Sequence, residues 1–159
     1  MKIPYVDLSY KNKSKKELIK VFKKVLDKGQ FVGGDEIDLF EKKIAKLCGT
    51  NYAVALNSGT DALTLALHLL GVRKGDEVIT PPNSFIASTA VIVHLGAKPV
   101  FVDVLNDQNI DPNEIQSAIT KKTKVIMPVH LSGRMSQMDK IMSIAKKNKL
   151  SVVEDAAQS

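Results

Sequence analysis

Three short polar segments have residue types suited to binding an anion or a planar ring, and the first is Asn57–Asp61. It stands directly before a helical pattern, and a helix N-terminus offers unpaired N–H groups and about half a positive charge to a phosphate. Gly59 would let a ligand approach the backbone closely, and Thr60 adds a hydroxyl donor. A plain helix cap by Ser58 or Thr60 explains the same residues. The segment is neither a Walker A loop nor a dinucleotide-binding fingerprint.

The second segment carries an acid at the end of an apolar run. Residues 150–153 are mostly apolar and are followed by Glu154 and Asp155. A carboxylate at the exit of a buried strand must be hydrogen-bonded, paired with a charge, or functional. A protonated ring nitrogen would be a suitable partner, because the ion pair keeps the proton on a pyridine and makes the ring a better electron sink. An aspartate that caps a following helix is the alternative.

The third segment, Pro81–Phe85, places an aromatic ring after another strand. Phe85 could lie flat on a planar cofactor, although a phenylalanine at a helix start is more often part of the core. His130 also ends a predicted strand, and we interpret it as a hydrogen-bonded structural residue. With His68 and His94 on predicted helices and only Cys48 as a thiol, no zinc-ligand spacing is present.

The periodicity of apolar residues predicts the elements that position these segments. Predicted strands cover 53–56, 77–80, 99–104, 125–130 and 150–154, and predicted helices cover 14–29, 35–49, 62–70, 84–95, a stretch from 111 onward, and 138–148. Ser14 with Glu17 is a predicted capping box for the first helix, and Asp35 and Asp111 are predicted caps of the second helix and of the helix that starts at 111. Alternating strands and helices indicate an α/β fold with a mainly parallel sheet and helices on both faces. Such sheets bind ligands beyond the carboxyl ends of their strands. We expect an α/β domain over 51–159, with 1–50 as an N-terminal helical segment packing on it.

The composition excludes several classes of protein. The chain has 159 residues, of which 44% are apolar and 25% charged, as in ordinary globular proteins. The net charge of +6 comes largely from lysines on the first predicted helix, and with two arginines, no Trp and 5% aromatic residues we expect no nucleic-acid partner. No apolar run is long enough to span a membrane, and the N-terminus lacks a signal-peptide pattern. A single cysteine fits a reducing compartment, so we expect a cytoplasmic protein.

Motifs in series along nearly the whole chain resemble those of the DegT/StrS-type sugar aminotransferases, which are pyridoxal-phosphate enzymes of fold type I. The matching segments are Ile3–Leu8, Gly29–Gly34, Phe40–Glu41, Ser58–Leu63, Gly75–Ile79, Gly96–Asp103, Pro128–Leu131 and Glu154–Gln158. The resemblance implies that the α/β part is the large domain of a fold type I aminotransferase, incomplete at its C-terminus. It also implies pyridoxal 5'-phosphate as the cofactor.

The resemblance implies cofactor-binding roles for three residues near the phosphate. Thr60 and the backbone of Asp61 would bind the phosphate group, and Gly59 would shape the turn that receives it. No metal ligand is implied.

The resemblance also implies three residues around the cofactor ring. Phe85 would stack on the ring, Asp155 would pair with the pyridinium nitrogen, and Gln158 would hydrogen-bond the phenolic oxygen. Two positions depart from the usual pattern. Ser84 stands where threonine usually precedes the aromatic residue, and Ser132 stands where tyrosine is common.

The lysine that binds the cofactor as a Schiff base lies, in this family, further along the chain than Asp155, and only Ala156–Ser159 follow here. No catalytic residue is therefore assigned, and we expect the 159-residue chain alone to be an inactive N-terminal fragment. The resemblance implies amino transfer from glutamate or glutamine to a nucleotide-linked keto-sugar, in the biosynthesis of surface polysaccharide or another glycoconjugate, by a homodimer. A sugar dehydratase of the same family, with His in place of the lysine, and a non-catalytic module that binds a phosphate ligand are the alternatives.

Overall fold

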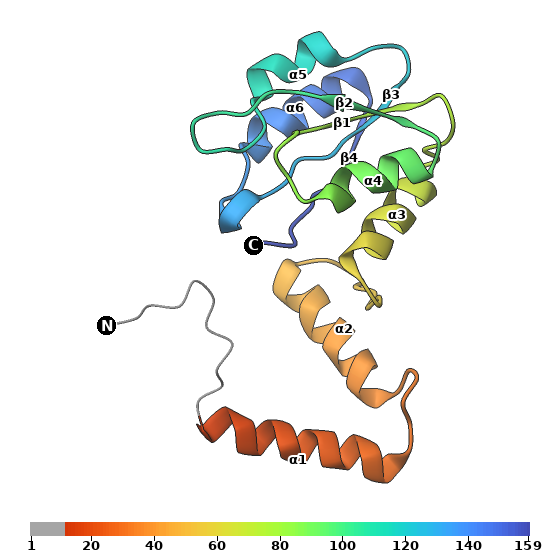
Figure 1. Ribbon diagram of the computed structural model, residues 1–159, viewed down its shortest axis with the longest axis vertical. Coiled ribbons are helices and arrows are strands. Elements are labelled where there is room, and N and C mark those ends of the chain that lie inside the picture. Colours follow the sequence, from red (N-terminus) through yellow and green to blue (C-terminus); the bar gives the residue numbers. More distant parts are fainter. Residues whose placement is uncertain (1–11) are drawn as a thin grey trace. The chain divides into compact units, whose positions relative to one another are not determined.

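The structure is a computed structural model that describes residues 12–159 (Figure 1). The segment Ile3–Leu8 of the family resemblance lies outside the described residues. The chain divides into two compact units, one ending at Ala55 and the other covering Leu56–Ser159. No helix in the described part of the chain is long and apolar enough to span a membrane.

The first unit contains the helices α1 (Asn12–Lys28) and α2 (Asp35–Cys48). The predicted capping box at Ser14 is wrong, because this residue lies inside α1, where the polar residues before it extend the helix by a further part of a turn. The α2 helix is capped by Gly34, with φ of 111°, and not by the predicted Asp35. Asp35 instead begins the helix, where its negative charge complements the helix dipole.

The described part of the first unit has almost no core of its own. Its one buried hydrophobic residue is Ala45, while several large apolar side chains of α1 and α2 are exposed, among them Phe22 and Leu47. The expectation that the N-terminal helices pack on the α/β domain stays a prediction.

The predicted strand over 53–56 is absent from the structure. The residues there form no strand, and Val54 is 75% exposed, although the apolar run predicted a strand buried on both faces. The backbone N–H of Ala55 donates to Glu41 Oε1 at 2.7 Å, so a side chain takes the place of a neighbouring strand. A short apolar run shows that a segment is extended, but it does not supply a pairing partner.

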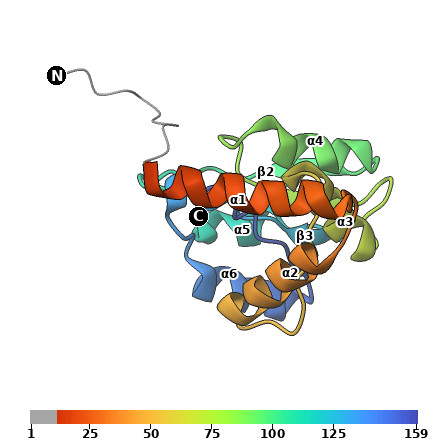
Figure 2. The same cartoon turned by 90° about the horizontal axis from the view of Figure 1, so that it is seen from below.

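The second unit is a four-stranded parallel sheet in the order β2-β1-β3-β4. Its strands and helices are α3 (Gly59–Leu69), β1 (Glu77–Thr80), α4 (Ile86–His94), β2 (Lys98–Phe101), α5 (Pro112–Ala118), β3 (Thr123–Ile126), the 3-10 helix η1 (Leu131–Gly133), α6 (Met138–Asn148) and β4 (Ser151–Val152). This is the predicted α/β architecture with a parallel sheet. Figure 2 shows α4 and α6 on opposite sides of the strands.

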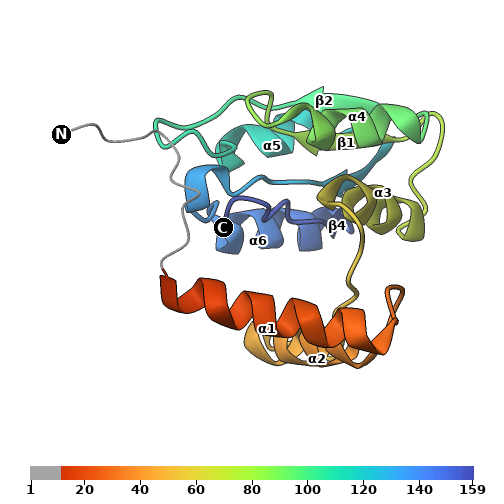
Figure 3. The same cartoon turned by 60° about the horizontal axis from the view of Figure 1, so that its bottom comes forward.

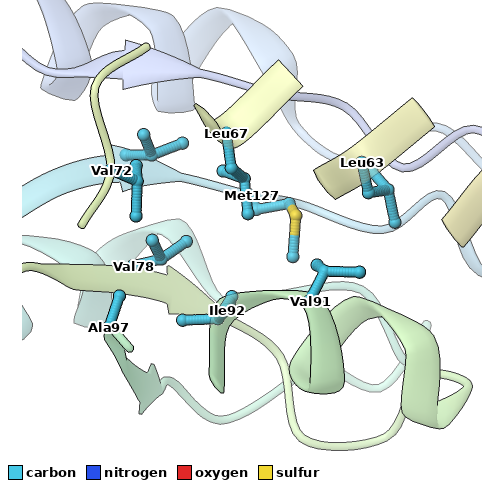
Figure 4. Packing of buried hydrophobic residues seen from close by; sticks show 9 residues of the cluster. Leu63, Leu67, Val72, Val78, Val91, Ile92, Ala97 and Met127 are labelled. Carbon is cyan, nitrogen blue, oxygen red and sulfur yellow. The ribbon is translucent and has the colours of Figure 1, made fainter. Parts of the chain in front are cut away.

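The two faces of the sheet carry separate cores because successive strand residues point to opposite sides. Val78 of β1 packs in one cluster with residues of α3 and α4 (Figure 4), whereas Ile79 packs in the other with Ile115 of α5 and Ile141 of α6. Burying these side chains contributes about 1.5–3 kcal/mol each. β1, whose four residues are all buried, is thereby held between β2 and β3.

β1 has the predicted bounds, whereas β2, β3 and β4 are shorter than predicted, and β3 shows why. It ends at Ile126, and Pro128 has no N–H to donate to a ladder. The chain remains extended beyond the proline and pairs again at an isolated parallel bridge between Val129 and Asp155. The carbonyl of Pro128 accepts from Asp155, and the carbonyl of Asp155 accepts from His130. The segment after β4 is thus held against the segment after β3.

Candidate functional site

A cavity of about 220 Å³ lies in the second unit, at the carboxyl ends of β1, β3 and β4. It is lined by Gly59, Thr60, Leu63, Ser84, Phe85, Ala87, Val129, Asp155, Ala157 and Gln158. Five of the six residues proposed from the sequence therefore lie around one space, although they come from three distant parts of the chain.

The N-terminus of α3 forms one wall of this cavity. Ser58 caps the helix, and its Oγ accepts from the N–H of Asp61 at 3.1 Å. Among residues 12–159, no protein group accepts a hydrogen bond from the N–H groups of Gly59 and Thr60. Both groups remain available, together with the Thr60 hydroxyl, to bind an anion at the positive end of the helix dipole.

The backbone of Asp61 was expected to bind the phosphate group, but the structure shows it in another role. It does not line the cavity, and its N–H is already satisfied by the Ser58 cap. In addition, the Asp61 carboxylate accepts a hydrogen bond from the Ser58 hydroxyl at 3.0 Å. The geometry therefore assigns Asp61 to capping the helix and leaves anion binding to Gly59 and Thr60.

Asp155 forms the opposite pole of the site and is only 8% exposed. Its Oδ2 accepts from the Ser88 hydroxyl at 2.7 Å, and its Oδ1 accepts from the Ala157 N–H at 3.3 Å. Within the described part of the chain, no Lys, Arg or His forms an ion pair with this carboxylate. A buried carboxylate without a counter-charge is costly, so the site favours a cationic ligand atom.

Phe85 lies on the cavity wall just before α4 and is 71% exposed. The side chain is therefore not part of a core, which was the alternative interpretation of its sequence position. An exposed aromatic face beside a cavity can stack on a planar ring.

Gln158 lines the cavity from the segment after β4. The C-terminal end of the chain lies beside the segment that leads into α6 (Figure 3). Its Oε1 accepts from the Ser132 N–H at 2.7 Å. Ser132 has a left-handed φ of 55°, and a Cβ on the neighbouring Gly133 would approach the Gln158 carbonyl oxygen to 3.1 Å. The η1 turn therefore fits closely against the Gln158 backbone and fixes the side-chain carbonyl.

His130 has a structural role, as its sequence position suggested. It is buried and outside the cavity lining; its Nε2 lies 2.8 Å from Glu154 Oε2. The N–H of Ser136 donates to Nδ1 at 3.3 Å, so the ring proton lies on Nε2 and is donated to Glu154. In the described residues no group of His, Cys, Asp and Glu side chains is arranged to hold a metal ion.

Sequence reasoning missed two residues that hold the site in place, Ser88 and Ser132. The spacing of Ser84 and Ser88, one helical turn apart, could have indicated a contact between their hydroxyl groups. No comparable signal points to the contact between Ser88 and Asp155, which are 67 residues apart. Nothing in the sequence around Ser132 indicates which side chain its N–H would meet.

Several solved structures that resemble this chain are aminotransferases. The chain superimposes with a TM-score of 0.94 on NtdA from Bacillus subtilis, solved with bound cofactor PMP, at 39% identity, and the match covers 99% of this chain and 37% of that one. The fold is therefore that of the fold type I aminotransferases.

The amino-acid sequence gives the family. Residues 12–159 match the DegT/DnrJ/EryC1/StrS aminotransferase family, and the chain belongs to it. It is 44% identical over 159 residues to the dTDP-3-amino-3,6-dideoxy-alpha-D-galactopyranose transaminase of Aneurinibacillus thermoaerophilus, covering 99% of this chain and 44% of that protein. It is 43% identical over 145 residues to the spore coat polysaccharide biosynthesis protein SpsC of Bacillus subtilis, covering 91% and 37% respectively. The chain thus spans less than half the length of these relatives.

Proposed function

We propose that the protein to which these residues belong transfers an amino group from glutamate or glutamine to the keto group of a nucleotide-linked sugar, with pyridoxal 5'-phosphate as its cofactor. The family match supports amino transfer, and the name of the dTDP-sugar transaminase supports a nucleotide-linked substrate. The bound PMP of the structural neighbour supports the cofactor. The name of SpsC supports a place in polysaccharide biosynthesis. The family resemblance supports a homodimer.

One observation carries the cofactor proposal. Counting partners from residues 12–159 only, the cavity has free N–H groups at the start of α3 and a buried carboxylate without a counter-charge at Asp155. Pyridoxal phosphate has a phosphate that suits the first pole and a basic ring nitrogen that suits the second. Both poles line one space, so a single ligand would satisfy them together.

The size of the cavity fits the same ligand. At about 220 Å³ it is smaller than the roughly 300–1,000 Å³ that is typical of sites for drug-sized molecules. It would hold a single substituted ring with a phosphate, and the nucleotide-linked sugar would bind outside it. Phe85 would cover one face of the ring, and Gln158 would donate through Nε2 to the phenolic oxygen.

In the proposed reaction the described residues bind and orient the cofactor. When bound, the vitamin B6 ring supplies an electron sink for moving the amino group. Asp155 would keep a proton on the ring nitrogen, and Gly59 and Thr60 would hold the phosphate in place. None of the residues that line the cavity is a lysine, so we place the Schiff-base lysine outside the described residues.

The test is a comparison of Asp155→Asn with the wild type, using pyridoxamine phosphate, which does not react with surface lysines. Asparagine keeps the shape and the hydrogen-bond acceptor but removes the charge. We expect at least a tenfold loss of affinity in calorimetry with this chain, and loss of amino transfer in the full-length protein. Asp139→Asn on the exposed side of α6 is the matched control. Wild-type turnover by the full-length Asp155→Asn variant would refute the proposal.

A further inference from the structure

A chain of hydroxyl groups leads from the cavity to the back of the Asp155 carboxylate. Ser84 lines the cavity, and its Oγ lies 2.9 Å from Ser88 Oγ. Ser88 does not line the cavity and is only 1% exposed. Its hydroxyl donates to Asp155 Oδ2 at 2.7 Å, which is a short and therefore strong contact.

The direction of these hydrogen bonds follows from the carboxylate. An ionised carboxylate only accepts, so the single proton of the Ser88 hydroxyl is committed to Asp155. Ser88 Oγ must then accept from Ser84. The two serines therefore form a one-way series of donors that ends on Oδ2.

The Ser88 hydroxyl is the side-chain group that orients Asp155. Apart from it, the carboxylate accepts only the longer bond from the Ala157 N–H among the described residues. A serine inside a helix commonly bonds to a backbone carbonyl one turn earlier, whereas Ser88 directs its proton out of α4 to the segment after β4. Its bond restricts the rotation of a carboxylate that lines the cavity.

We propose that Ser88 is a positioning residue for Asp155, and that it holds the carboxylate in register with the ring nitrogen of a vitamin B6 phosphate. Ser84 supports Ser88 by donating to it. This inference rests on the proposed function, because it assumes that Asp155 meets a ring nitrogen. It adds a residue outside the cavity to the binding of the cofactor.

The test uses two ligands that differ at one atom. Pyridoxamine phosphate has the ring nitrogen, and its 1-deaza analogue has a CH group in that place and cannot pair with Asp155. Calorimetry with this chain compares wild type with S88A, S88T and S84A. S143A, at an exposed serine of α6, is the matched control.

We expect S88A to lower the affinity for pyridoxamine phosphate about ten- to hundredfold, which is the usual effect of losing one hydrogen bond to a charged group. The wild type should have a low affinity for the 1-deaza analogue, and S88A should not lower that affinity further. S88T keeps the hydroxyl and should restore the affinity, whereas S84A should cause a smaller loss, again only for the natural ligand. The ultraviolet absorbance of the bound ligand, which reports protonation of the ring nitrogen, should change in S88A.

An equal loss for both ligands in S88A would show a merely structural role and would overturn the inference, as would an unchanged affinity for pyridoxamine phosphate. If S88A does not fold, a selective loss in S84A supports the inference and an equal loss for both ligands overturns it. Failure of the wild-type chain to bind pyridoxamine phosphate would instead refute the proposed function itself, and the role of Ser88 with it.

Discussion

The backbone N–H of Ser132 donates to the side-chain oxygen of Gln158 across 2.7 Å. This bond settles which end of the amide is which, because only the oxygen can accept. The Nε2 group has no acceptor among the described residues and lies on a side chain that lines the cavity. Gln158 is thereby prepared to donate a hydrogen bond to a ligand.

Gln158→Glu tests this orientation. Glutamate still accepts from Ser132, but it offers no donor and adds a negative charge beside a phenolic oxygen. We expect the affinity for pyridoxamine phosphate to fall about tenfold or more, as measured by calorimetry, with an unchanged urea midpoint because the residue is exposed. Gln137→Glu, at the exposed N-cap of α6, makes the same change away from the cavity and should leave binding intact. Equal affinities for the Gln158→Glu variant and the wild type would contradict the assignment.

Gly59 is the exception among the nine glycines of the chain, because the other eight have a left-handed φ. A Cβ at Gly59 would meet no atom within 4 Å, so neither the backbone nor the fold requires glycine there. We expect Gly59→Ala to leave the free energy of unfolding unchanged or to raise it by about 0.4–1 kcal/mol. The added methyl group would occupy space in the anion site and weaken the binding of inorganic phosphate and of pyridoxamine phosphate. A variant that is destabilised but binds both ligands normally would reverse this interpretation.

Thr80, at the end of β1, has a fully buried hydroxyl without a hydrogen-bond partner in the described part of the chain. Such a group costs about 1–3 kcal/mol relative to an apolar group of the same shape. We therefore expect Thr80→Val to raise the free energy of unfolding by about 1 kcal/mol in urea titrations. Thr80→Ser keeps the hydroxyl and loses the methyl group, so it should be less stable than the wild type. Loss of stability in the valine variant would show that the hydroxyl has a partner.

The ion pair between Lys28 and Glu36 in the first unit should respond to pH in a defined direction. The Lys28 Nζ lies 3.0 Å from Glu36 Oε1, and this hydrogen bond lowers the pKa of Glu36 below its ordinary value of 4.5. It also raises the pKa of Lys28 above its ordinary 10.5. The pair therefore stabilises the fold between these values, and the effect is lost as pH falls through the Glu36 pKa or rises through the Lys28 pKa.

An NMR titration of the Glu36 carboxyl checks this prediction. Its midpoint should lie below 4.5 in the wild type and move back toward 4.5 in Lys28→Met. High salt should have a similar effect, because both side chains are in contact with solvent and are screened by its ions. Lys46→Met, in the last turn of α2, should not change the midpoint. A titration that is the same with and without Lys28 would show that the two side chains do not interact in solution.

Local sequence signals predicted those parts of the fold that depend on neighbouring residues. The predicted cap at Asp111 and the bounds of α6 at Met138–Asn148 agree with the structure, because a cap and an apolar period act within a few residues. The prediction of a strand over residues 53–56 was wrong because a strand depends on distant residues. A strand needs a partner, and the sequence of the segment does not show whether one is available.

The candidate site divides in the same way. Gly59, Thr60 and Asp155 were identified because each stands at a predicted strand exit or helix start, and the parallel sheet brings those ends together. The bond between Ser88 and Asp155 depends on how α4 meets the segment after β4. The spacing of residues along the chain does not indicate that these two side chains meet.

The position of β1 in the middle of the sheet has a consequence for synthesis on the ribosome. Glu77 pairs with Lys98 of β2 on one side and with Thr123 of β3 on the other. One edge of β1 therefore stays unpaired until β3 has been synthesised. Non-local parallel pairing of this kind slows folding, and an unpaired apolar edge is prone to aggregation. Until β3 has been synthesised, the nascent chain therefore exposes an apolar strand edge.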